Sequence, residues 1–200
     1  MSMSRRDFFR FGLQNAAKMA GDAVADKLGL EGDIIRPPFA LAEAAFLDTC
    51  TKCDACIEAC AYDIIFKLPD DMGGKRAGTP VLDLAVSGCH LCADWPCVSV
   101  CEPAALVLPE ADGEANAPPI WPKLADAVIN KESCLPYAGP ECGACRDACR
   151  VSGALNWEQG TKPVIDNDVC TGCALCRDAC ITDPKSIDIR AVATVLPAAD

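Results

Sequence analysis

The residues best suited to chemistry in this 200-residue chain are sixteen cysteines, which fall into four motifs of four. Two motifs share the spacing C-x2-C-x2-C-x3-C: Cys50, Cys53, Cys56 and Cys60, then Cys170, Cys173, Cys176 and Cys180. The two others have wider gaps: Cys89, Cys92, Cys97 and Cys101, then Cys134, Cys142, Cys145 and Cys149. The chain therefore carries an internal repeat of a ligand motif.

Such spacing suits a cubane of iron and sulfide. Three thiolates two residues apart can wrap one face of a 4Fe-4S cluster from a single tight loop. We expect the fourth cysteine of each motif to lie at the start of a following helix and to ligate a second cluster. All sixteen cysteines are then cofactor-binding metal ligands, and they account for four 4Fe-4S clusters without remainder.

Two other uses of cysteine compete with this interpretation. Disulfides suit an oxidising compartment, but cysteines two residues apart are awkward to bridge, and disulfide frameworks usually occur in chains below about 80 residues. Zinc sites usually bring together two separated C-x2-C pairs, whereas here three ligands crowd one loop. The spacing therefore favours iron and sulfide over both, and the colour of the protein would decide.

The elements that must position these cysteines are short. A β-prone run follows each motif, at residues 64–66, 105–108, 154–157 and 186–189, and return strands at 80–84 and 163–166 complete two hairpins. A motif, a hairpin and a second motif make one ferredoxin-like unit. The predicted fold class is therefore α+β, with two tandem ferredoxin-like modules of two 4Fe-4S clusters each, preceded by an N-terminal amphipathic helix.

The domain organisation follows from these units. We expect an N-terminal helix and linker at residues 1–45, a first module at 46–110, a linker at 111–119 and a second module at 120–200. The linker is rich in small, acidic and proline residues and shows no periodicity. Pairing of motif one with two and of three with four is preferred. Nesting of motifs two and three between one and four stays open.

The N-terminal segment allows two interpretations. Residues 4–10 resemble a twin-arginine export signal. From Phe9 onward, however, Phe9, Leu13 and Val24 share one helical face, with polar and charged residues opposite, and the longest apolar run after Arg10 is short. We therefore predict a retained docking helix and a cytoplasmic protein, with periplasmic twin-arginine export as the alternative.

Charge and motifs exclude several functions. The 29 acidic residues outnumber 18 basic ones, for a net charge of -11, which argues against binding of nucleic acid. No stretch approaches the roughly 18 apolar residues of a transmembrane span. The chain has a single histidine, His90, and no dinucleotide fingerprint, so we expect an electron carrier or accessory redox protein and not an enzyme.

A family resemblance covers about residues 34–190 of the chain. Residues 35–39, leading into the first motif, and the long gap between Cys134 and Cys142 resemble NapF-type ferredoxin proteins encoded with periplasmic nitrate reductase. The second motif, with Trp95 and Pro96 before Cys97, looks more like the related NapG and MauM type.

The resemblance implies four 4Fe-4S clusters that relay electrons to or within a molybdenum (nitrate) reductase system. It also implies a redox partner, either the molybdenum reductase or a membrane protein on the quinol side. The alternative is an accessory or maturation protein that docks on the reductase and is not a turnover carrier.

Overall fold

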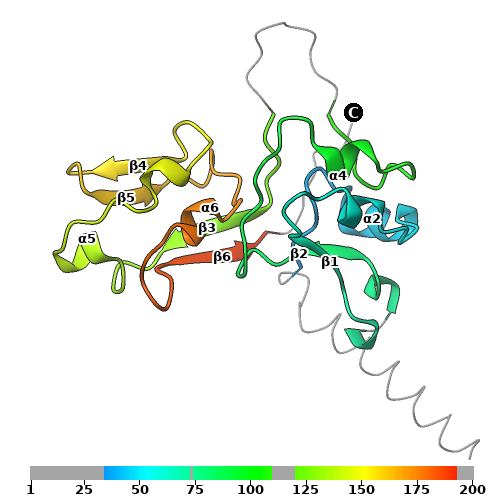
Figure 1. Cartoon of the computed structure of the whole chain (residues 1–200), viewed down its shortest axis with the longest axis horizontal. Helices are drawn as coiled ribbons and strands as arrows, with labels where there is room; N and C mark the ends of the chain where they lie inside the picture. Colours follow the sequence, from blue (N-terminus) through cyan, green and yellow to red (C-terminus); the bar gives the residue numbers. More distant parts are fainter. Residues whose placement is uncertain (1–33, 73, 110–119, 193–200) are drawn as a thin grey trace, which may run out of the picture.

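The computed structural model describes residues 34–72, 74–109 and 120–192, which form short helices and three two-stranded sheets (Figure 1). The helices are α2 (Glu43–Thr49), α3 (Ala55–Glu58), α4 (Pro96–Ser99), α5 (Leu135–Ala138) and α6 (Leu175–Asp178). Single 3-10 turns lie at η2 (Asp70–Met72), η3 (Gly74–Arg76) and η4 (Arg146–Ala148). The strands are β1 (Ile65–Lys67), β2 (Pro80–Leu82), β3 (Ala125–Ile129), β4 (Leu155–Glu158), β5 (Lys162–Ile165) and β6 (Ile187–Ala191). The described part is a small α+β fold, as predicted.

The two predicted hairpins are present. β1 pairs antiparallel with β2, with Ile65 opposite Leu82. β4 pairs antiparallel with β5, with Leu155 opposite Ile165. The chain reverses between β4 and β5 with Gly160 at a φ of 75°, a left-handed conformation that glycine adopts without steric cost.

A third sheet joins segments that lie far apart in the chain. β3 pairs antiparallel with β6, from Ala125 opposite Ala191 to Ile129 opposite Ile187. The sequence predicted β6 near its observed position but assigned it no partner, and it predicted no strand at β3. This pairing matters for the sites below, because it fixes the loops that precede and follow the second half's cysteines.

The strand predicted at residues 105–108 is wrong. Leu106 forms only an isolated bridge with Ala40, flanked by hydrogen bonds from Leu41 N to Ala105 O (3.0 Å) and from Val107 N to Phe39 O (2.9 Å). The facing segment continues into Pro37 and Pro38, which have no N–H group to donate. The facing segment also turns here, because Phe39 has a φ of 57° and the Ala40 N–H group donates to Pro37 O at 3.3 Å, so the ladder ends at this bridge.

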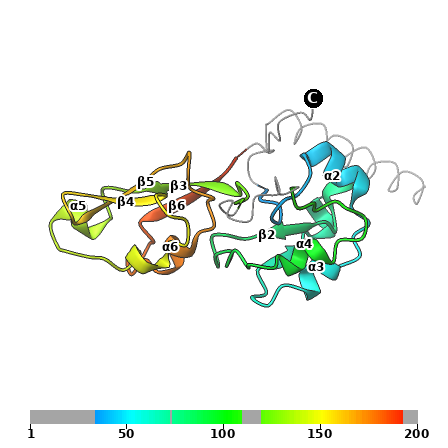
Figure 2. The same cartoon turned by 90° about the horizontal axis from the view of Figure 1, so that it is seen from above.

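One hydrophobic core runs from the first half of the chain into the second, and the two halves lie side by side (Figure 2). Phe46 and Leu84 from the first half and Ala125 and Ala154 from the second are at most 1% exposed and belong to this core. A smaller core around Ala127 lies in the second half. The two halves are therefore packed together and are not independent bodies.

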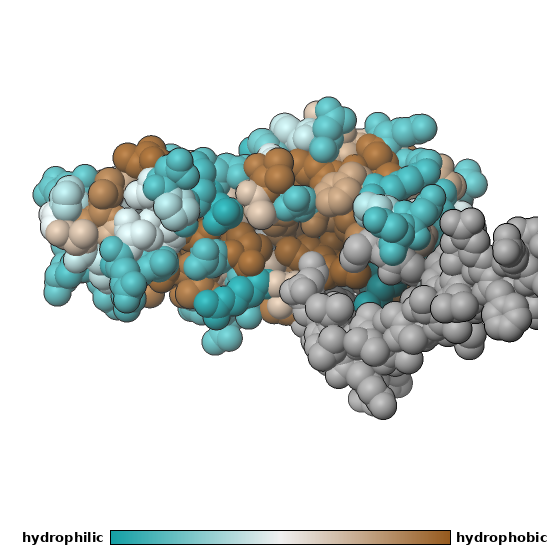
Figure 3. Space-filling view, turned by 90° about the horizontal axis from the view of Figure 1, so that it is seen from below, coloured by the Kyte–Doolittle hydropathy of each residue, from teal (hydrophilic) through white to brown (hydrophobic). Residues whose placement is uncertain are grey.

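Apolar residues also gather over the middle of one face (Figure 3). A hollow in the structure is lined by Ile35 and Leu82 from the first half and by Ile189 from β6. Asp83 and Arg190 also line this hollow, so its walls are both apolar and charged.

No helix in residues 34–72, 74–109 or 120–192 is long and apolar enough to cross a membrane. The predicted N-terminal amphipathic helix and the predicted linker at 111–119 lie outside the described residues.

Candidate cofactor sites

The structure gathers the cysteines into four groups, each built from three cysteines of one motif and the fourth cysteine of another. We call them site 1 (Cys50, Cys53, Cys56, Cys101), site 2 (Cys60, Cys89, Cys92, Cys97), site 3 (Cys134, Cys142, Cys145, Cys180) and site 4 (Cys149, Cys170, Cys173, Cys176). Motifs one and two exchange their fourth cysteines, and so do motifs three and four.

Sites 1, 3 and 4 are small pockets whose walls include all four cysteines of the group. The other wall residues are mainly apolar, such as Phe46 and Leu106 at site 1 and Ala154 and Ile165 at site 4. At site 2, burial first and then the neighbouring thiols of Cys89, Cys60, Cys56 and Cys92 raise the pKa of the Cys97 thiol. Three of these four neighbours complete the group, and Cys56 belongs to the adjacent site 1.

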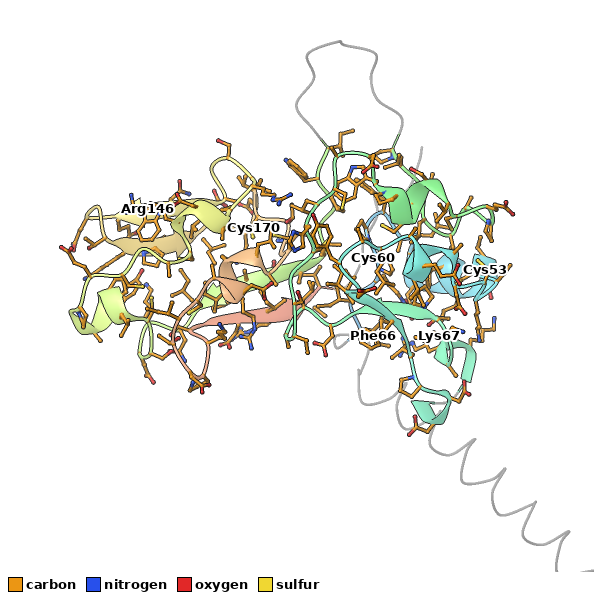
Figure 4. All side chains as sticks on the ribbon, viewed as in Figure 1. Cys53, Cys60, Phe66, Lys67, Arg146 and Cys170 are labelled. Atoms are coloured by element: carbon orange, nitrogen blue, oxygen red, sulfur yellow. The ribbon has the colours of Figure 1, made fainter. Side chains whose placement is uncertain are left out.

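The sites follow one another in the order 1, 2, 4, 3. Neighbouring sites are close enough for the charge of one thiolate to raise the pKa of a thiol in the next. Cys56 of site 1 raises the pKa of Cys97 in site 2 in this way. Cys173 of site 4 does the same for Cys89 of site 2, and Cys145 of site 3 for Cys176 of site 4. Figure 4 shows the first three sites of this order, because Cys53 of site 1, Cys60 of site 2 and Cys170 of site 4 follow one another along the long axis of the molecule.

Tight loops and one-turn helices position the cysteines. Lys52 and Asp54, between the ligands of site 1, have φ values of 59° and 68°, a left-handed conformation that costs a non-glycine residue roughly 1–2 kcal/mol. The third cysteine of motifs one, two and four then lies inside α3, α4 or α6. The expectation that the fourth cysteine begins a helix is wrong: it follows the helix end, where the chain is free to turn toward the other site.

Burial changes the acidity of the thiols. Together with neighbouring thiols it raises the pKa of Cys97 and Cys176 from 9.0 to about 12, and that of Cys56 to about 11. Without a bound cation these groups stay protonated at neutral pH. Four thiolates can share such a pocket only around positive charge, so metal loading must release protons.

Cys180 differs, because its pKa is lowered. Burial alone would raise it, but hydrogen bonds from Thr182 and Ser186, with the charge of Lys185, outweigh burial. The Thr182 hydroxyl lies 3.2 Å from Cys180 Sγ, and Ser186 Oγ lies 2.8 Å from Thr182 Oγ1. Site 3 therefore has a thiolate that the protein itself stabilises.

His90 lies between two ligands of site 2 and stacks on Tyr62, with ring centroids 3.5 Å and ring planes 1° apart. Burial, followed by the charge of Arg150, lowers the pKa of His90. Its Nδ1 atom is buried and has no hydrogen-bond partner among the described residues. These observations favour a neutral imidazole beside the ligands of site 2.

The donor set of these sites fits an iron-sulfur cluster. All sixteen cysteines are free thiols. Backbone amides already point at two of the sulfurs, from Leu106 N to Cys101 Sγ (3.4 Å) and from Gly172 N to Cys170 Sγ (3.3 Å). Amides placed in this way stabilise the sulfurs of a cluster. These groups differ from a site for a single ion. Within the described ranges, no three His, Cys, Asp or Glu side chains lie close enough together to bind one metal ion.

The sequence is similar to several ferredoxin-type proteins. NapG of Escherichia coli strain K12 is 32% identical over 203 residues, which cover 92% of this chain and 84% of NapG. The methylamine utilization protein MauM of Methylorubrum extorquens is 30% identical over 210 residues, covering 94% and 89%. NapF of Escherichia coli is 29% identical over 149 residues, covering 73% and 79%. No family model and no solved structure matches the chain.

Proposed function

Because the chain belongs to the ferredoxin-type family of NapG, MauM and NapF, we propose that it is an electron-transfer protein with four 4Fe-4S clusters. The clusters would lie in two tandem ferredoxin-like modules, held by sites 1 and 2 and by sites 3 and 4. The observation that carries this proposal is the exchange of fourth cysteines, because one loop that serves two clusters is the ferredoxin arrangement.

When bound, such clusters supply one-electron exchange. The residues of this chain hold, shield and tune them. Apolar walls such as Phe46 at site 1 and Ile165 at site 4 exclude water, and the Leu106 and Gly172 amides donate to the sulfurs. The protein thus provides insulation and hydrogen bonds, and no substrate chemistry is assigned to it.

The order 1, 2, 4, 3 favours a relay over a docking protein, because an accessory module needs no row of adjacent centres. The two ends of the row differ in exposure. At site 1, Cys53 is exposed, whereas the cysteines of site 3, at the other end of the row, are buried or half-buried. Site 1 is therefore the end at which a redox partner can approach a ligand most closely.

The partner we propose is a molybdenum (nitrate) reductase or a protein on the membrane quinol side, following the family resemblance. The competing role is maturation of the reductase. A loaded protein that binds the metal-free reductase tightly but accelerates reduction of no partner would establish the competing role. We also propose that the protein is retained in the cytoplasm. Recovery of the folded protein from the periplasm after cell fractionation would contradict this localisation.

Anaerobic iron and sulfide analysis with electron paramagnetic resonance (EPR) tests the proposal. We expect about four irons and four sulfides per site. Cys101→Ser should weaken site 1, although Cys101 belongs to the second motif, and leave site 2 loaded, whereas Cys60→Ser should do the reverse. A colourless protein that yields zinc would contradict the proposal. So would loss of the site 2 cluster in Cys101→Ser and of the site 1 cluster in Cys60→Ser, because each cysteine would then ligate the cluster of its own motif.

A further inference from the structure

The two halves of the molecule meet by backbone contact between site 2 and site 4. The N–H group of Cys89 donates to the carbonyl oxygen of Cys173, with N and O 2.7 Å apart. Both cysteines are buried in the shared core. A ligand of the first half thus touches a ligand of the second half through one hydrogen bond.

Gly88 makes this approach sterically feasible. A Cβ atom at this position would lie 2.8 Å from Cys173 O, 2.8 Å from Leu175 N and 3.0 Å from the carbonyl carbon of Ala174. These atoms belong to backbone, so they cannot rotate away as a side chain could. Any residue with a side chain would therefore push the two loops apart.

Asp178 holds the same junction from the other side. Its Oδ2 atom accepts a hydrogen bond from the N–H group of Gly88 at 2.7 Å, across 90 positions of sequence. Asp178 ends α6, the helix that carries Cys176 of site 4. The carboxylate therefore couples the site 4 helix to the residue that directly precedes Cys89.

We infer that Gly88 and Asp178 are positioning residues that set the separation of sites 2 and 4, the two middle sites of the row. The inference rests on the proposed function for its consequence, since this separation governs passage of electrons between the halves. It adds that the junction between the halves is part of the relay and not only a packing surface.

Gly88→Ala in the full-length protein tests the inference, with Gly143→Ala as the matched control. Gly143 also lies in a cysteine loop, but a Cβ there meets only Arg146 Nε at 3.9 Å, and neither glycine has a positive φ. In Gly88→Ala we expect hydrogen exchange at the Cys89 amide to accelerate roughly tenfold to a hundredfold. In the dithionite-reduced protein, the magnetic coupling between the clusters of sites 2 and 4, measured from the EPR lines, should weaken. Gly143→Ala should change neither.

Asp178 provides a second, gentler test. Asp178→Ala removes the acceptor and should accelerate exchange at the Gly88 amide and weaken the EPR interaction, with iron content kept. Asp178→Asn keeps an acceptor oxygen and should restore both. A merely structural role would predict loss of iron without this rescue.

The outcomes separate the two proposals. Unchanged exchange and unchanged EPR lines in Gly88→Ala would overturn the inference. If Gly88→Ala failed to load iron, unchanged lines in Asp178→Ala would overturn it, and altered lines restored in Asp178→Asn would support it. If the wild-type protein held no iron, the proposed function would fall, and the exchange rates at Gly88 and Cys89 would still decide whether these residues position the junction.

Discussion

The guanidinium group of Arg36 holds both carboxylate oxygens of Glu43, in two hydrogen bonds of 2.8 Å, although Arg36 is only 6% exposed. Its Nη1 atom donates to Thr79 Oγ1 at 2.8 Å, and the group lies 4.5 Å from the centre of the Phe46 ring. Glu43 begins α2, the helix that leads into Cys50. This half-buried pair therefore ties the helix before the first cysteine loop to the residue that directly precedes β2.

Replacing Arg36 should destabilise the protein. Arg36→Met leaves the Glu43 carboxylate with Arg76 as its remaining donor and the Thr79 hydroxyl oxygen with none, so we expect the free energy of unfolding to fall by about 1–3 kcal/mol. Urea unfolding under anaerobic conditions measures this. Lys75→Met is the control, because it removes only the exposed pair with Asp48 and should cost less than about 1 kcal/mol. Equal effects of the two variants would contradict the assigned role of Arg36.

The same pair makes stability depend on pH. Burial raises the pKa of Glu43, but the hydrogen bonds and charges of Arg36 and Arg76 outweigh it and hold the pKa below the ordinary 4.5. The carboxylate contribution is thus fully present above the unfolded-state pKa and is lost as pH falls through the lower folded-state pKa. Urea midpoints measured from about pH 6 down to about pH 3 should fall more steeply for wild type than for Glu43→Gln. Parallel curves would refute this.

The hydroxyl beside Cys180 should tune site 3. A donor to a ligand sulfur stabilises the more negative, reduced state, so Thr182→Val should lower the reduction potential of this site by roughly 20–60 mV. Thr182→Ser keeps the donor and should stay near wild type. Redox titration followed by EPR gives both values. An unchanged potential in Thr182→Val would show that the hydroxyl does not donate to the sulfur of the loaded site.

Gly172 should be intolerant of any side chain. A Cβ at this position would lie 1.9 Å from the carbonyl oxygen of Ala125 in β3, and its φ of 72° already disfavours other residues. We expect Gly172→Ala to lose iron from site 4. Gly160→Ala is matched in conformation, with φ at 75°, but has no atom within 4 Å of the added Cβ, so it should keep its iron. Equal iron content in both variants, by chemical analysis, would disprove the steric argument.

The parts of the fold that the sequence predicted are those with local signals. The hairpins β1–β2 and β4–β5 arise from adjacent apolar runs with glycine between them, so their positions followed from the pattern. The cysteine spacing likewise predicted which residues would gather, because three ligands of each site come from one loop.

The parts that were missed depend on partners distant in sequence. β3 becomes a strand because it faces β6, and nothing within residues 125–129 indicates that pairing. Arg36 would be assigned to the surface from its residue type, yet its partners Glu43 and Thr79 lie 7 and 43 positions away. The strand expected at residues 105–108 failed for the same reason, since the facing segment, distant in sequence, turns at Phe39 and does not extend.

The core that extends from Phe46 to Ala154 has a consequence for dissection of the protein. After proteolytic cleavage within residues 110–119, we expect the two fragments to stay associated. The hydrogen bonds from Gly88 to Asp178 and from Cys89 to Cys173 would still join them, together with the shared hydrophobic core. Such fragments should elute together under native conditions. Each half expressed separately would expose the apolar surface of the shared core to water and should precipitate. We therefore expect each half to depend on the other for solubility, although the ligand motif is repeated.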